Sequence, residues 1–392
     1  MIQLLARIFI KNREDTANPA VREAYGVLCG AVGFGFNLLL FAGKFLAGRL
    51  TGSIAIVADA INNLSDAGSS IITLLGFKLA AKKPHSDHPY GHGRFEYIAG
   101  LIVSLAILMM GFDLARSSIE KIFNPEAVDF SLLSIIILGV SILVKLYMAV
   151  YNRKISKKIN SATVAAAAAD SLSDACATSV VLFSTLICRF TGYNVDAWAG
   201  AAVSLLILQA GFCAARDTIS PLLGKAPDPE FVRRIEEIVG EYPEVVGMHD
   251  LMVHDYGAGR VMISLHAEVP ASGNILLLHD VIDTIERRLQ TELKCSAVIH
   301  MDPISTDDEE IAHTREKVLR QIHSSIGKEI SLHDFRMVPG PTHTNVIFDV
   351  VVPYGFRLSD AQVKAEVSRI VREIEGDYFA IVSVDHPFVT DS

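Results

Sequence analysis

Long apolar stretches with few charged residues fill the first half of the chain. Six of them approach or exceed the length of about 20 residues that an α-helix needs to cross a bilayer. They cover residues 24–47, 52–80, 97–119, 131–151, 161–188 and 197–220. The pattern therefore predicts an α-helical, multi-pass membrane domain with six transmembrane helices that contact the lipid bilayer.

Beyond Pro227 the apolar positions become short and regularly spaced, as in a soluble domain. The predicted elements are helices over 228–241 and 275–292 and strands over 249–256, 261–269 and 297–301. The order helix, strand, strand, helix, strand predicts an α+β domain of the ferredoxin-like, open-faced sandwich type.

The soluble pattern then occurs a second time. The segment that begins GMHDLMVHDYGAGRVMISLHAEVP aligns with SLHDFRMVPGPTHTNVIFDVVVP at an offset of 83 to 84 residues, so residues 308–390 are predicted to be a second copy. The acidic run from Asp307 to Glu310 is expected to be the hinge between the copies. The predicted domains are an N-terminal segment (1–23), a six-helix transmembrane domain (24–223) and two ferredoxin-like domains (224–305 and 306–392).

The distribution of charge divides the chain in the same way. Residues 1–224 hold 19 Lys and Arg against 15 Asp and Glu, whereas residues 225–392 hold 16 against 29. A membrane-like half is thus followed by an acidic soluble half, which argues against a nucleic-acid partner. The five cysteines form no CxxC pair and predict no disulfide framework.

The positions of the basic residues predict the orientation in the membrane. If both termini lie on one side, that side holds 14 Lys and Arg, including Arg22 and Lys145, and the other side holds only five, including Lys44. Since basic loops stay in the cytoplasm, both termini are predicted to be cytoplasmic, in an inner or plasma membrane.

Carboxylates and amides inside two predicted spans are the candidate chemistry. Asn62 and Asp66 are four residues apart in the second span, and Asp170 and Asp174 are four apart in the fifth, so each pair lies on one helical face. Carboxylates in lipid are costly and usually line an ion path. Because two carboxylates one turn apart repel each other unless a cation or protons neutralise them, the four oxygen ligands predict a cation site.

These polar groups have three other interpretations. They could be polar contacts between helices that bind no ion. Asp59 could extend the same face as a proton acceptor without being a direct ligand. An intramembrane aspartyl protease could use paired aspartates, but each helix would then supply one catalytic carboxyl and a GxGD motif would be expected, so we predict that the protein is not an enzyme.

Together, the six spans, the two polar pairs, the loop HPYGHGRFE and the soluble-domain segments GMHDL and VIHMDP resemble the cation diffusion facilitator family of divalent metal/proton antiporters. The resemblance implies a tetrahedral transport site at Asn62, Asp66, Asp170 and Asp174. It also implies a homodimer, divalent metal cations as substrates, protons as the counter-ion and no tightly bound cofactor.

The ligand types favour manganese as the transported ion. None of the 13 histidines lies in a predicted span, so the site has only oxygen ligands, which suit Mn²⁺ or Fe²⁺ better than Zn²⁺. Asn-Asp/Asp-Asp sites also resemble those of manganese-exporting family members. Efflux of Zn²⁺ or Fe²⁺ by the same alternating-access mechanism is the alternative, and a membrane-anchored metal sensor is the alternative from another class.

Two further metal sites are implied by the resemblance. His88 and His92 flank PYG in a loop where family members can bind metal. In the first soluble copy, His249, His266, His300 and Asp302 match positions that bind regulatory metal. The corresponding residues of the second copy, His333, Asp349, Asp385 and His386, are expected to be mainly structural.

Overall fold

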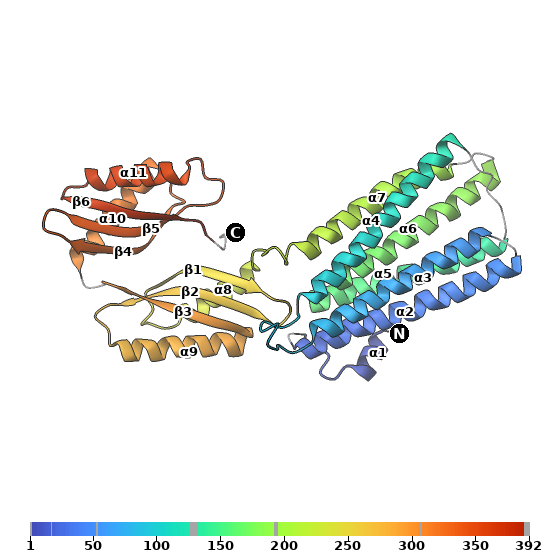
Figure 1. Cartoon of the computed structure of the whole chain (residues 1–392), viewed down its shortest axis with the longest axis horizontal. Coiled ribbons are helices and arrows are strands. Elements are labelled where there is room, and N and C mark those ends of the chain that lie inside the picture. The colour runs from blue at the N-terminus through green and yellow to red at the C-terminus, as the bar shows by residue number, and fades with distance from the viewer. Residues whose placement is uncertain are drawn as a thin grey trace. The chain divides into compact units, whose positions relative to one another are not determined.

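The computed structural model of the chain describes residues 2–16, 18–51, 54–124, 132–191, 195–305 and 308–387 (Figure 1). It has two compact units, Met1–Lys225 with Tyr256–Gly259, and Ala226–Asp255 with Arg260–Ser392. The first unit is helical, and its elements are α1 (Ile2–Phe9), α2 (Pro19–Thr51), α3 (Ile54–Ala80), α4 (Phe95–Phe123), α5 (Leu132–Ile159), α6 (Ala162–Thr191) and α7 (Asp196–Ile219).

Five helices of the described residues are long and apolar enough to cross a membrane: α2, α4, α5, α6 and α7. The remaining predicted span corresponds to α3, which has 27 residues but carries Asp59, Asn62, Asn63 and Asp66 in its first half. These polar residues make α3 less apolar than its neighbours, although its length suffices for a span. Five of the six predicted spans are therefore confirmed, and the sixth remains a prediction.

Two lysines that the charge count assigned to loops, Lys44 and Lys145, lie buried inside helices. The predicted span 131–151 already contained Lys145, although the count treated this residue as part of a loop, and Lys145 lies buried in the middle of α5. Lys44 likewise lies inside α2 and is buried. Both ammonium groups pair with carboxylates of other helices, which is why they can occur within an apolar helix.

Small residues let the helices pack closely. A Cβ atom added at Gly100 of α4 would lie 2.7 Å from Thr163 Oγ1 of α6 and 2.7 Å from Thr218 Cγ2 of α7. Such contacts require glycine, and they are typical of helix packing in membranes, where close backbone approach replaces the hydrophobic driving force. Figure 1 shows α2 to α7 running side by side as a bundle.

A buried ion pair joins the start of α4 to α2. Both Arg22 guanidinium Nη groups contact the Glu96 carboxylate, with Nη2 donating to Oε1 at 2.9 Å, and Arg22 Nε donates to the Ile159 carbonyl at 2.8 Å. The Ser161 hydroxyl also donates to Glu96 Oε1, at 2.6 Å. Arg22 and Glu96 therefore connect α2, α4 and the α5–α6 turn, and Glu96 is not available to the neighbouring histidine loop.

The second unit contains two three-stranded sheets with matching topology. The first half consists of α8 (Pro229–Gly240), β1 (Gly247–Asp255), β2 (Val261–Pro270), α9 (Ile275–Leu293) and β3 (Cys295–Ile304). The second half consists of α10 (Glu309–Ser325), β4 (Ser331–Pro339), β5 (Thr344–Val351), α11 (Asp360–Glu373) and β6 (Tyr378–Asp385). In each sheet the first two strands are antiparallel and the last two are parallel. Each half has its own apolar core, with Leu265 and Phe348 fully buried at the two centres. The order helix, strand, strand, helix, strand predicted between residues 228 and 301 agrees with the order of elements in the first half.

The acidic run is not simply a hinge. Asp307 lies outside the described residues, but the Asp308 side chain accepts hydrogen bonds from the backbone of Glu310 and Ile311 at the start of α10. Glu309 and Glu310 form the first turn of that helix. Acidic residues there satisfy free N–H groups and interact favourably with the helix dipole, so this part of the run is a helix start.

We predict that Glu96→Ala strongly destabilises the helical unit. The substitution leaves the Arg22 guanidinium buried without its carboxylate, and loss of one partner of such a pair costs about 3–5 kcal/mol. Thermal unfolding of the detergent-solubilised protein measures the effect. Glu120→Ala is the control, because Glu120 pairs with Arg116 on an exposed helix face, and it should leave the melting temperature nearly unchanged.

Candidate metal sites

Three predicted ligands meet inside the helical unit. Oxygen atoms of Asp66 from α3 and of Asp170 and Asp174 from α6 all lie within 4.8 Å of one another. Asp66 and Asp174 are buried, and Asp170 is partly buried. Three carboxylates this close repel one another, so the cluster needs positive charge beside it.

Lys145 of α5 supplies part of that charge. Its ammonium Nζ donates to Asp66 Oδ2 at 2.7 Å and to Asp174 Oδ2 at 2.5 Å. The lysine is only 2% exposed. One ammonium thus bridges α3 and α6, and the cluster is a four-residue ionic site built by three helices.

The fourth predicted ligand is placed differently from the three aspartates. Asn62 lies one turn before Asp66 but is exposed, whereas the neighbouring Asn63 is buried and its amide donates to the Asp59 carbonyl at 2.9 Å. Asp59 pairs with Lys44 at 2.8 Å. The carboxylate of Asp59 is therefore engaged by α2, and a ligand role for Asn62 remains a prediction.

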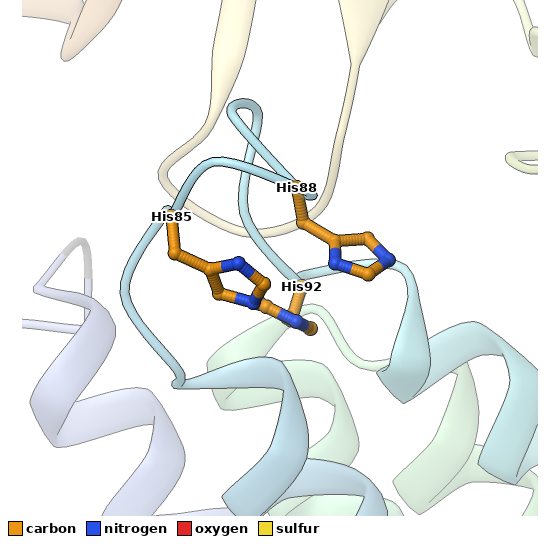
Figure 2. A group of neighbouring side chains, drawn as sticks. All are labelled: His85, His88 and His92. Atoms are coloured by element: carbon orange, nitrogen blue, oxygen red, sulfur yellow. The ribbon is translucent and has the colours of Figure 1, made fainter.

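The loop before α4 brings together one histidine more than predicted. Ring nitrogens of His85, His88 and His92 lie within 4.8 Å of one another, and their ring centroids are 4.6 to 5.1 Å apart. His85 and His88 exchange backbone hydrogen bonds, which fold the loop back on itself. Figure 2 shows the three rings gathered on one side of the loop.

In the first soluble half, one carboxylate joins the predicted histidines. Asp302 Oδ2 lies 2.9 Å from His266 Nδ1 and 3.1 Å from His249 Nε2, and Oδ1 lies 3.2 Å from His300 Nε2. A ligand atom of Asp250 also lies within 4.8 Å of His249 and His266. The four predicted residues are thus adjacent, and imidazole with carboxylate is a competent donor set for a divalent metal.

The second soluble half contributes to the same region. The rings of His249 and His333, which are equivalent in the sequence alignment, stack with centroids 4.9 Å apart. Asp334 and Asp349 line the same cavity of about 310 Å³ as His249, His266 and Asp302. Burial, and then the charge of His249, lower the pKa of His333, and burial raises the pKa of Asp334. His386 instead forms a hydrogen bond with the Val352 carbonyl at 2.8 Å.

Sequence reasoning missed three residues of these sites. Lys145 was assigned to a loop, although a lone lysine within an apolar run signals a buried partner. His85 is absent from the predicted ligands, and its contribution depends on the loop reversal. Asp250 follows His249 at a β-bulge and has a backbone φ of 51°, a conformation that strand alternation does not predict.

Five helices that are long and apolar enough to span a membrane, with a buried acidic cluster beside them, are typical of a membrane transporter for cations. Residues 31–223 match the family of cation efflux transmembrane domains, and residues 227–304 match the family of cytoplasmic domains of cation efflux proteins. The chain is 34% identical over 267 residues to an uncharacterized transporter of Methanocaldococcus jannaschii, a match that covers 68% of this chain and 94% of the relative. The chain therefore belongs to the cation efflux, or cation diffusion facilitator, family, and it is a transporter and not an enzyme.

Two further relatives have more specific names. The chain is 29% identical over 268 residues to the manganese efflux system protein MneS of Bacillus subtilis, covering 68% of this chain and 92% of the relative. It is 27% identical over 271 residues to the cation-efflux pump FieF of Shewanella oneidensis, covering 69% and 91%. Residues 305–392 lie beyond both family matches.

We predict that Asp302→Ala removes one bound divalent ion per chain from the soluble unit. Asp302 contacts all three histidines, so its loss leaves them without the shared carboxylate. Titration of the purified full-length protein with Zn²⁺, followed by calorimetry, counts the sites. His279→Ala is the control, because His279 is exposed on α9, and it should leave the count unchanged. An equal count in wild type and Asp302→Ala would contradict metal binding here.

Proposed function

We propose that the protein exports a divalent metal cation from the cytoplasm through the Asp66, Asp170 and Asp174 cluster. The observation that carries this proposal is the convergence of three carboxylates, from two different helices, within 4.8 Å of one another inside the helical unit. Oxygen atoms of this number and spacing suit a small doubly charged ion. Membership of the cation efflux family supports the same conclusion.

Manganese is the substrate that the ligand chemistry favours. The cluster offers oxygen atoms without thiolate or imidazole, and such donors suit Mn²⁺ better than Zn²⁺. The similarity to a manganese efflux protein supports this choice, and the similarity to the cation-efflux pump keeps Fe²⁺ and Zn²⁺ as alternatives. Uptake assays with each ion in turn distinguish them.

Exchange against protons follows from charge. Carboxylates bind the metal when ionised and release it when protons replace it, so a site that alternates between the two sides of the membrane exports metal and returns protons. In this scheme Asp66, Asp170 and Asp174 act both as metal ligands and as proton carriers. Asn62 acts as a neutral ligand if α3 turns it toward the cluster.

The soluble unit is proposed to be cytoplasmic and to mediate dimerisation. Residues 227–304 match the cytoplasmic dimerisation domain of cation efflux proteins, which supports a homodimer with both termini in the cytoplasm. The net negative charge of this half attracts divalent cations near the membrane surface. The histidine clusters of the loop and of the first soluble half are proposed as peripheral sites for the same class of ion. Residues 308–390 are proposed to be a duplicate of the first soluble domain.

Asp174→Asn should abolish metal transport. The substitution removes one of three ionised ligands from a buried cluster, so metal affinity is expected to fall at least about tenfold. Reconstituted liposomes with an internal metal dye and an internal pH dye report Mn²⁺ uptake and proton release together. Asp113→Asn is the control, since Asp113 is also in a helix of the unit but on its exposed face.

The same variants separate export from metal sensing. Cells that carry Asp174→Asn should become sensitive to Mn²⁺, whereas cells with Asp113→Asn should stay resistant. If Asp174→Asn cells retain full resistance and the soluble unit still binds metal, the spans only anchor a sensor and the export proposal is wrong.

A further inference from the structure

Lys145 is the one member of the acidic site that the export scheme above does not use. Its ammonium is 2% exposed and bridges Asp66 and Asp174 at 2.7 and 2.5 Å. These are short, charge-assisted hydrogen bonds, and the oxygen atoms that they occupy belong to two of the three proposed metal ligands. An ion that binds these oxygens must therefore compete with the ammonium.

Charge balance gives this competition a direction. Three ionised carboxylates and one ammonium have a formal charge of −2, which one divalent cation neutralises and one monovalent cation does not. A divalent ion also attracts each carboxylate about twice as strongly as the ammonium does at the same distance. A monovalent ion has no such advantage over a cation of equal charge.

The lysine is also permanently close to the site because α5 holds it there. A tethered group competes at a high effective concentration, far above that of a free ion of the same charge. The helix thus keeps a monovalent cation on the carboxylates whenever no stronger ligand takes its place.

We propose that Lys145 is a tethered competitor cation that determines the charge selectivity of the transport site. It holds the Oδ2 atoms of Asp66 and Asp174 between transport events, yields them to a divalent metal, and excludes K⁺ and Na⁺. By competing, it also weakens metal binding and so speeds release of the metal. This inference rests on the proposed transport function of the same carboxylates.

The structure offers a matched comparison for Lys145. Lys44 is equally buried, lies within α2 and pairs with Asp59 of α3 at 2.8 Å. Asp59 is not one of the three clustered carboxylates. Removal of either lysine therefore deletes one buried ammonium from the helical unit, but only Lys145 touches the proposed ligands.

The experiment measures Mn²⁺ affinity by calorimetry for wild type, Lys145→Met, Lys145→Arg and Lys44→Met, with KCl or with choline chloride at equal ionic strength. In choline, Lys145→Met should bind Mn²⁺ about tenfold more tightly than wild type, because the competing charge is gone. In KCl, the affinity of Lys145→Met should fall, because K⁺ now reaches the carboxylates. For wild type, Lys145→Arg and Lys44→Met, the Mn²⁺ affinity measured in KCl should equal the affinity measured in choline chloride.

Transport assays complete the test. Lys145→Met liposomes should export Mn²⁺ more slowly than wild type, since tighter binding slows release, and K⁺ should inhibit them.

If Lys145→Met keeps the wild-type affinity and stays insensitive to K⁺ while Asp174→Asn loses Mn²⁺ binding, the competitor role is wrong and the transport site stands. If Asp174→Asn retains binding and transport, the transport site itself is wrong. Should Lys145→Met fail to fold, Lys145→Gln replaces it in the same experiment. A fall of the Mn²⁺ affinity of Lys145→Gln in KCl supports the proposal, and an unchanged affinity contradicts it.

Discussion

Compensation of buried charge is the constraint on which the helical unit depends. A charged group in a hydrocarbon environment is costly unless an opposite charge lies beside it. Lys44 with Asp59, Arg22 with Glu96, and Lys145 with two aspartates meet this requirement, and each pair joins different helices. The ion pairs therefore set which helix faces meet, and the close glycine contacts let those faces approach.

The acidic cluster differs from the other two pairs because its charges do not balance. Glu96 and Asp59 each have one basic partner, whereas Asp66, Asp170 and Asp174 share one lysine. An excess of negative charge in a buried site creates affinity for a mobile cation, and a balanced pair does not. This difference separates the proposed transport site from ion pairs that only hold the bundle together.

The two halves of the soluble unit place the same chemistry at the same position. His249 and His333 precede Asp250 and Asp334, whose φ angles of 51° and 50° accompany a register shift in β1 and in β4. The equivalent rings stack on each other, so the two halves contact each other at this position. Histidines of the first half and carboxylates of both halves line one cavity.

The sequence by itself determined the long apolar helices and the αββαβ order of the two halves of the second unit, because helical and strand periodicities are local properties of the chain. It also singled out the three carboxylates that cluster in the structure. Spacing of four residues fixed the Asp170–Asp174 face in the same way. Only the tertiary structure decided that Lys145 reaches Asp66 and Asp174, that His85 joins the loop cluster and that Asp302 contacts three histidines. These contacts join residues far apart in the chain or depend on a loop reversal, so no periodicity records them, and the partner of a buried charge can be identified only once the helices are packed.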